Sequence, residues 1–277
     1  MIQIESAGIT DVGKQREGNE DAYLLDDEHQ LYVVADGMGG HLAGEVASGI
    51  VVETFRSALE RDDASGIAVI DETLSAEGNR VLAWIQTANE LVHRKAQQDE
   101  DCRGMGSTVS AVYCTDSTMI TANVGDSPIY LVRNGEIELI SFEHTVAAEQ
   151  AGTDPERLKR IPEKFLHMLS RAVGVAEDVE ADASETPCFT GDIVIICSDG
   201  LSNLVSPEEI CTLVAENPPD AACRLFVDMA NDRGGHDNIT VIVLKITGIT
   251  SKKGLLAGFL PGLWERAGTL LKNLINR

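Results

Sequence analysis

The 277-residue sequence predicts an α+β fold in which helices cover mostly antiparallel β-sheets. The expected strands and helices come in blocks and do not alternate as β–α–β units. Asn134-Gly135 lies between two β-branched segments and is typical of a two-residue hairpin turn, because both residues tolerate positive φ. Apolar residues make up 43% of the chain and aromatic residues only 4%, which indicates a globular core of small aliphatic side chains.

The N-terminal third of the chain is expected to form strands followed by two long helices. Apolar and polar residues alternate at the start, which is typical of a strand. Two later segments carry apolar residues at the spacing of one helix face. The expected elements are an opening strand from Ile2, strands over residues 22–25 and 31–35, and helices over residues 42–60 and 76–97.

The rest of the chain is expected to be rich in strands and then helical. Residues 145–172 are polar and carry charges of both signs, so we expect them to form an excursion across the surface. Pro207 follows Ser206, a residue type that caps helix N-termini, so a helix is expected to begin there. The other expected elements are strands over residues 109–114, 119–124, 129–132, 193–197 and 238–246, and a helix over residues 219–231.

Charge, cysteine content and the N-terminal sequence exclude several classes of protein. The formal net charge of −23 repels phosphate backbones, so nucleic acid is not expected as a partner. Six cysteines occur without a Cys-x-x-Cys pair, mostly in apolar segments, which indicates reduced, buried thiols in a cytoplasmic protein. The sequence contains no signal peptide and no apolar segment of about 18 residues, so no membrane-spanning helix is expected.

The last thirty residues differ from the rest in charge. Residues 251–277 carry a net charge of +4 in an otherwise acidic chain, so we expect a domain over residues 1–247 and a basic tail over residues 248–277. One helix face of the tail is apolar: Leu263, Ala267, Leu270, Leu271, Leu274 and Ile275. We expect this face to pack on its own domain or on a partner protein. The alternative is peripheral attachment to the inner face of the membrane.

Four acidic residues lie next to glycine or a turn at the ends of hydrophobic strands. The segments that carry them are Asp36-Gly37-Met38-Gly39-Gly40, Asn123-Val124-Gly125-Asp126-Ser127, Ser198-Asp199-Gly200 and Gly234-Gly235-His236-Asp237-Asn238. One Asp-Gly pair alone is an ordinary turn. The repetition indicates that these carboxylates meet at one edge of a sheet.

Carboxylates gathered in this way would favour a bound cation. Two such charges about 4 Å apart repel by about 4 kcal/mol at an effective dielectric constant of 20. Oxygen ligands without histidine or thiolate suit Mg²⁺ or Mn²⁺ better than Zn²⁺. Arg16 is a candidate for binding phosphate oxygens beside such a site, although an ordinary surface arginine is the alternative.

Six motifs together resemble those of the bacterial metal-dependent protein phosphatases of type 2C, the PPM family. They occur in the order of that family and span residues 16–240. The motifs are Arg16 with Asn19-Glu20-Asp21, Asp36-Gly37-Met38-Gly39-Gly40-His41, Gly106-Ser107-Thr108, Asn123-Val124-Gly125-Asp126-Ser127, Ser198-Asp199-Gly200-Leu201, and Gly235-His236-Asp237-Asn238-Ile239-Thr240.

The resemblance implies a four-layer α/β/β/α sandwich of two mostly antiparallel sheets, with a flap at about residues 144–172. It also implies a site for two Mn²⁺ or Mg²⁺ ions and a third, weaker one. By the same resemblance, Asp36 bridges the first and second ions, and the Gly37 carbonyl contacts the second. Asp199 and Asp237 hold the first ion, and Asp126 with Asp199 holds the third. Glu20 and Asp21 act through metal-bound waters, and Arg16 binds phosphate.

The implied activity is hydrolysis of phosphoserine and phosphothreonine in proteins by direct attack of a hydroxide shared between the ions. The implied partners are phosphoprotein substrates and a cognate serine/threonine kinase. Two alternatives stay open: a catalytically inactive module that binds phosphopeptides or a kinase, and a hydrolase of small phosphate esters.

Three positions depart from the usual family pattern. Pro128 stands where many members carry arginine, and little catalytic loss is expected from it. Met38 stands where animal members carry a histidine that serves as general acid, so the proton donor to the leaving group is not identified. His144, in Phe142-Glu143-His144-Thr145, either assists proton transfer or orders the flap.

Overall fold

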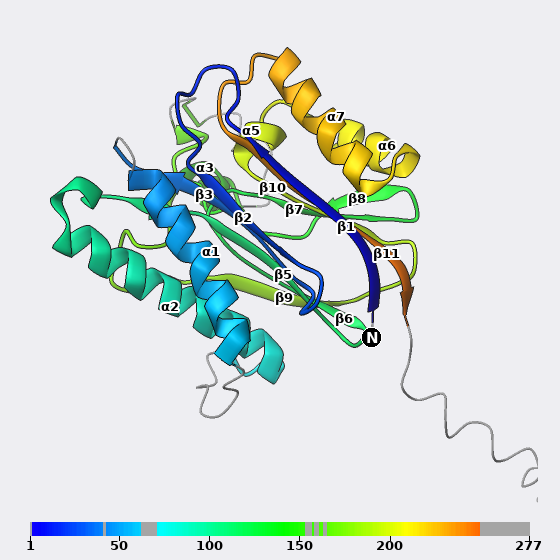
Figure 1. Ribbon diagram of the computed structural model, residues 1–277, viewed down its shortest axis with the longest axis horizontal. Helices are drawn as coiled ribbons and strands as arrows, with labels where there is room; N and C mark the ends of the chain where they lie inside the picture. Colours follow the sequence, from blue (N-terminus) through cyan, green and yellow to red (C-terminus); the bar gives the residue numbers. More distant parts are fainter. Residues whose placement is uncertain are drawn as a thin grey trace, which may run out of the picture.

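The computed structural model describes residues 2–40, 43–61, 71–152, 157, 161, 162 and 165–249, with only the backbone of residues 60 and 61. Two antiparallel sheets lie face to face. Helices α1 and α2 cover one sheet, and α6 and α7 cover the other (Figure 1). The predicted α+β class and the four-layer sandwich implied by the family resemblance are confirmed.

The first sheet has the strand order β1-β11-β10-β7-β8. Its strands are β1 (Ile2–Asp11), β11 (Ile239–Ile249), β10 (Ile193–Cys197), β7 (Ile129–Arg133) and β8 (Glu136–Leu139). The predicted hairpin joins β7 to β8, with positive φ at both Asn134 (55°) and Gly135 (81°). Gly248 and Ile249 still pair with β1, so the sheet includes the first residues of the expected tail.

The second sheet has the strand order β2-β3-β5-β6-β9, and β4 pairs with the end of β3. Its strands are β2 (Asp21–Asp26), β3 (Leu31–Met38), β4 (Gly106–Ser107), β5 (Val109–Thr115), β6 (Thr118–Val124) and β9 (Asp182–Pro187). The sequence did not predict β9, whose residues are polar and mostly exposed. Register pairs Asp21 with Asp36, which places two acidic residues at the same end of the sheet.

Helices α1, α2, α6 and α7 agree with the expected segments, and α2 and α6 begin at side-chain caps. The helices are α1 (Ala43–Arg61), α2 (Ala76–Gln98), η1 (Glu100–Cys102), α3 (Val146–Ala151), α5 (Asp199–Ser202), α6 (Pro207–Glu216) and α7 (Pro219–Asp232). The Ser75 side chain caps α2, and Ser206 forms a capping box with Glu209 at the start of α6. The short helix α5 was not predicted, because four residues are too few to show helical periodicity.

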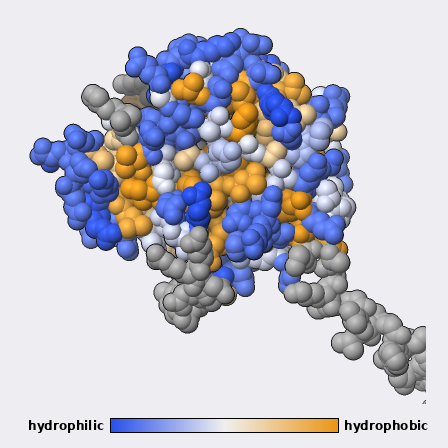
Figure 2. All heavy atoms as spheres, in the orientation of Figure 1, coloured by the Kyte–Doolittle hydropathy of each residue, from blue (hydrophilic) through white to orange (hydrophobic). Residues whose placement is uncertain are grey.

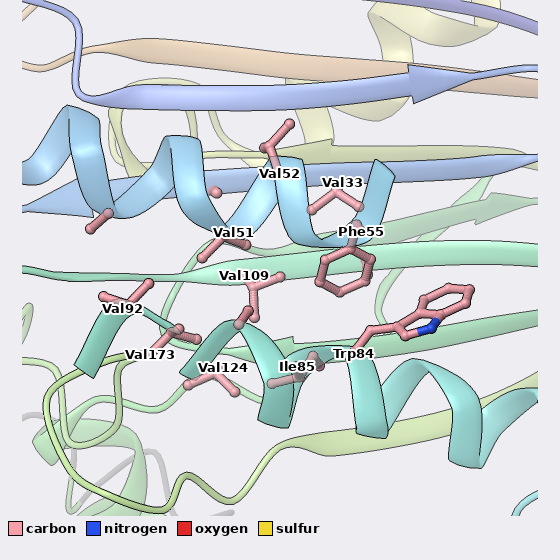
Figure 3. Packing of buried hydrophobic residues seen from close by; sticks show 14 of the residues in the cluster. Val33, Val51, Val52, Phe55, Trp84, Ile85, Val92, Val109, Val124 and Val173 are labelled. Atoms are coloured by element: carbon pink, nitrogen blue, oxygen red, sulfur yellow. The ribbon is translucent and has the colours of Figure 1, made fainter. Parts of the chain in front are cut away.

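Three apolar layers hold the four structural layers together. Val33, Phe55 and Trp84 belong to the layer between the second sheet and helices α1 and α2 (Figure 3). A second layer, which includes Tyr32 and Ile242, fills the space between the sheets. The third layer joins the first sheet to α6 and α7. Each sheet is therefore buried on both faces, which fixes the strand ends relative to one another.

The surface seen in Figure 2 is mostly hydrophilic, with apolar patches among the polar residues. No helix among the described residues is long and apolar enough to cross a membrane. The six cysteines are free thiols, and five of them are buried. The basic amphipathic segment expected in the tail lies outside the described residues.

Candidate active site

A cavity of about 470 Å³ opens where several strands of the two sheets end. Its wall includes residues from the β1–β2 loop, the end of β3, the turn after β6, the start of α5 and the turn before β11. The charged residues of this wall that the sequence singled out are Arg16, Glu20, Asp36, Asp126, Asp199 and Asp237. The predicted site residues thus come from distant parts of the chain to one cavity.

Asp36 is fixed by the backbone around it. The Thr108 hydroxyl accepts a hydrogen bond from the Asp36 N–H at 2.9 Å, and the Thr108 N–H donates to the Asp36 carbonyl at 2.8 Å. Burial, reinforced by the neighbouring carboxylates beginning with Asp21, raises the pKa of Asp36 well above its usual value. The Asp36 carboxyl is hydrogen-bonded to Asp199, whose pKa is also raised, first by burial and then by Asp237.

Asp126 and Glu20 extend the acidic wall on either side. Burial and the charge of Asp199 raise the pKa of Asp126 to about 7. The pKa of Glu20 is raised mainly by burial, and Arg16 opposes that effect. Both shifts mean that negative charge in the cavity lacks compensation from the surrounding protein. A cation in the cavity would supply that compensation.

Asp21 lies behind the wall and is absent from the described lining of the cavity. Its carboxylate accepts hydrogen bonds from the Ser198 hydroxyl at 2.8 Å and the Thr240 hydroxyl at 2.6 Å. Burial raises the pKa of Asp21 to about 6, although these two bonds oppose the shift. Asp21 is therefore placed to act on the cavity indirectly, through Asp36 beside it.

Arg16 reaches across the mouth of the cavity to Asp237. One guanidinium nitrogen lies 2.7 Å from the Asp237 carboxylate, and the Arg16 side chain is 47% exposed. Asn238 holds the loop that carries Arg16, because its amide donates to the Gly18 carbonyl at 2.9 Å and accepts from the Glu20 N–H at 2.8 Å. A half-exposed guanidinium on a braced loop retains donors for an incoming anion.

Gly37 and Gly44 allow two backbone segments to approach each other closely at the cavity. A Cβ on Gly37 would lie 2.1 Å from the Gly44 carbonyl oxygen and 2.6 Å from that of Glu20. The Gly44 N–H, at the N-terminus of α1, donates to the Glu20 carboxylate. Glycine at these positions therefore brings the helix N-terminus onto the acidic wall.

The donor set fits Mn²⁺ or Mg²⁺, because the wall offers several carboxylates, a backbone carbonyl and no thiolate. Within the described part of the chain, no three acidic, histidine or cysteine side chains are already gathered around one point. Arg16 engages Asp237, and Asp36 contacts Asp199.

Some residues of the cavity wall were not assigned a role from the sequence. Thr108 lies in one of the quoted motifs, and its contact with Asp36 gives it a function in positioning. His167, Met168 and Leu169 also line the cavity. They carry no local pattern that would mark them, because tertiary hydrogen bonds to residues 144–146 bring them to the cavity.

Comparisons with known proteins agree with this geometry. The family described as Protein phosphatase 2C matches residues 13–217. The serine/threonine phosphatase stp of Listeria innocua is 33% identical over 247 residues, which cover 85% of this chain and 93% of that protein. The Mycobacterium tuberculosis serine/threonine phosphatase PstP/Ppp is 29% identical, with a TM-score of 0.76 over 88% of this chain and 99% of that one. The PstP catalytic domain in complex with two manganese ions is 27% identical and has a TM-score of 0.75, again over 88% and 99%.

Proposed function

The chain belongs to the protein phosphatase 2C family, and we propose that the carboxylate-lined cavity is its catalytic centre. It is a metal-dependent serine/threonine protein phosphatase that acts on phosphoproteins and uses Mn²⁺ or Mg²⁺. The observation that supports this assignment of the site is the convergence of Asp36, Asp199 and Asp237 on one cavity with Arg16 at its mouth.

Each predicted site residue has a proposed role. Asp36 would bridge the two main ions, the Gly37 carbonyl would contact the second, and Asp199 and Asp237 would hold the first. Asp126, with Asp199, would hold a third and weaker ion, while Glu20 and Asp21 would act through bound water. When bound, the ions lower the pKa of a water molecule and offset the charge of the phosphoryl group.

The protein's own side chains supply orientation and charge. Arg16 would bind two non-bridging oxygens of the phosphoryl group through its planar set of donors. Thr108 holds the backbone of Asp36, and Asn238 holds the loop of Arg16, so the backbone at both residues is fixed before substrate arrives. Met168 and Leu169 add apolar side chains to the cavity wall.

The experiment that tests this assignment measures phosphate release from a phosphothreonine peptide and from p-nitrophenyl phosphate. We expect turnover of both substrates with Mn²⁺ and none with EDTA. Undiminished turnover of the peptide in EDTA would contradict metal dependence. Turnover of the small ester alone would favour a small-molecule phosphatase, and turnover of neither would favour the inactive binding module.

Replacing Arg16 by alanine is expected to lower kcat/KM for the phosphopeptide by about 10- to 100-fold. A hydrogen bond to a charged group contributes about 1.5–3 kcal/mol, and each 1.4 kcal/mol corresponds to about tenfold. Steady-state kinetics with saturating Mn²⁺ would measure the loss. Lys14→Ala is a matched control, because Lys14 is a cation of the same loop whose ion pair with Asp232 lies away from the cavity. Equal losses in the two variants would show that Arg16 acts only through general electrostatics.

We further propose that the domain predicted over residues 1–247, together with Gly248 and Ile249 of β11, carries the catalytic function and that the rest of the tail serves in docking. The proposed contacts of the tail are its own domain, a partner protein or the inner face of the membrane, with the enzyme otherwise in the cytoplasm. A cognate serine/threonine kinase is the proposed regulatory partner. The apolar helix face and the net charge of +4 in residues 251–277 support a docking role for the tail.

Deletion of residues 251–277 is expected to leave kcat on p-nitrophenyl phosphate unchanged. The described sheet is complete at Ile249, the partner of Ile2, and the cavity is lined by residues before 238. The measurement is steady-state turnover of the truncated and full-length proteins at equal Mn²⁺. A large loss of turnover with an unchanged Tm would show that the tail is part of the catalytic body.

A further inference from the structure

His144 is completely buried at the base of the flap, and both of its ring nitrogens are hydrogen-bonded. Nδ1 accepts the Gly125 N–H at 3.1 Å, and Nε2 lies 2.5 Å from a carboxylate oxygen of Asp182. A backbone N–H can only donate, so Nδ1 is unprotonated and the ring proton is on Nε2. His144 is also absent from the described lining of the cavity. Neither nitrogen is therefore free to exchange a proton with substrate.

On one side, His144 clamps the turn that carries Asp126. The His144 N–H donates to the Gly125 carbonyl at 2.9 Å, while the Gly125 N–H donates back to the His144 ring. The two hydrogen bonds therefore join both the N–H and the carbonyl of Gly125 to the same residue, and the φ of Gly125 is +107°. Thr108 packs directly against Gly125, because a Cβ there would lie 2.6 Å from the Thr108 side chain. The position of the adjacent Asp126 therefore depends on the His144 ring.

On the other side, the backbone around His144 is hydrogen-bonded to the segment that contains the cavity-lining residues 167–169. The Ser170 N–H donates to the His144 carbonyl at 2.9 Å, and the Val146 N–H donates to the Met168 carbonyl at 2.8 Å. Thr145 forms a β-bridge with Leu169. Residues 167–169 thus reach the cavity through their pairing with residues 144–146.

Asp182 and Arg171 fix the orientation of the ring between these two sides. Arg171 lies 3.2 Å from the same Asp182 oxygen that faces His144, and 3.4 Å from Nε2 of the ring. Arg171 also contacts Glu149 of α3 at 3.4 Å. The imidazole is therefore held by Asp182 of β9 and by Arg171, which in turn contacts α3. A side chain fixed from so many elements transmits a displacement of one element to the others.

We propose that His144 is a positioning residue that couples the cavity wall at residues 167–169 to the turn that carries Asp126. This inference rests on the proposed function, because it assumes that the cavity binds substrate and that Asp126 holds an ion. A phosphopeptide that contacts residues 167–169 would then bias the position of Asp126. Hydrolysis of a small ester that does not reach residues 167–169 would depend only on the contact between His144 and Gly125.

Two substitutions separate the two functions of the ring. In His144→Asn the amide oxygen takes the place of Nδ1, so the bond to Gly125 is kept and the contact with Asp182 is lost. In His144→Gln the amide reaches Asp182, and the acceptor for Gly125 is lost. We expect His144→Asn to lower kcat/KM for the phosphopeptide about tenfold, through a higher KM, while turnover of p-nitrophenyl phosphate stays near the wild-type rate. We expect His144→Gln to raise the Mn²⁺ concentration for half-maximal turnover of p-nitrophenyl phosphate about tenfold.

Asp182→Asn is the conservative control, because its amide oxygen still accepts the Nε2 proton, and it should retain most of the phosphopeptide activity. Two further readouts do not depend on activity. Nitrogen NMR of the wild-type protein in EDTA should show an Nε2-protonated His144. Hydrogen exchange at Gly125 should be faster in His144→Gln than in His144→Asn.

The inference is overturned if the asparagine and glutamine variants share one kinetic profile, or if Nδ1 carries the ring proton. An equal loss on both substrates, in proportion to a lower Tm, would also overturn it, because that result indicates a purely structural residue. Failure of the proposed function is distinguishable, since the wild-type protein itself would then show no Mn²⁺-dependent turnover.

Discussion

Replacing Asp36 by asparagine is expected to lower kcat by about 10³-fold or more on both the phosphopeptide and p-nitrophenyl phosphate. Asp36 lies in the cavity wall, and its neighbours include Asp21, Asp126, Asp199 and Asp237. Its removal takes away the oxygen proposed to join the two main ions. The loss should fall on kcat, because the ions act on the reacting groups and not on the remote parts of the substrate.

The fold is expected to tolerate the same substitution. Asparagine has the shape of aspartate, and its neutral side chain avoids both the burial of a charge and the repulsion that raise the pKa of Asp36. The Tm in EDTA should therefore stay at or above the wild-type value. Addition of Mn²⁺ should raise the Tm of the wild-type protein more than that of the variant, because binding to the folded state alone stabilises it.

Asp228→Asn is the matched control for Asp36→Asn, because Asp228 is an exposed residue of α7 and its substitution makes the same change in net charge. We expect its kcat and its response to Mn²⁺ to equal those of the wild-type protein. If Asp36→Asn retained a third of the wild-type kcat at saturating Mn²⁺, the assignment of Asp36 as the shared ligand would be wrong. A large fall in Tm in EDTA would instead make Asp36 a structural residue.

Much of the fold could be predicted because its strongest elements are locally periodic. The long helices α1 and α2 and the β-branched strands show their apolar faces within a few residues, and Asn134-Gly135 specifies the hairpin. Strand β9 shows no such face. It is held at the sheet edge by pairing with β6 and by Glu185, which accepts hydrogen bonds from the backbone and side chain of Ser75. These contacts lie far apart in sequence, so no local pattern reports them.

The candidate site was predictable to a similar degree. Asp36, Asp126, Asp199 and Asp237 could be found because each lies next to glycine or a turn at a strand end. Their convergence depends on strand register, as in the pairing of Asp21 with Asp36. The sequence left two functions open for His144, proton transfer and ordering of the flap. The imidazole is buried and both of its nitrogens are already hydrogen-bonded, which favours a role in ordering the flap. That distinction depends on which groups surround the imidazole, and those groups come from three separate segments.

Replacing Gly37 by alanine is expected to destabilise the protein by about 3 kcal/mol or more. The new Cβ would lie 2.1 Å from the Gly44 carbonyl oxygen and 2.6 Å from the Glu20 carbonyl oxygen. Both obstacles are backbone atoms, so no side-chain rotation relieves the overlap. The strand end and the N-terminus of α1 must move apart, which also displaces the Gly37 carbonyl proposed to contact an ion. Denaturant unfolding in EDTA would measure the loss of stability, and turnover per folded molecule would measure the loss of activity.

Gly49→Ala tests whether the effect arises from close packing and not from the loss of glycine itself. Gly49 is exposed in the middle of α1, and nothing lies within 4 Å of a Cβ placed on it. Alanine there should stabilise the protein by about 0.5–1 kcal/mol, because it has the higher helix propensity. Opposite signs for the two substitutions are therefore expected. A Gly37→Ala protein as stable as wild type, with unchanged Mn²⁺ dependence, would contradict the close contact between β3 and α1 on which the shape of the cavity depends.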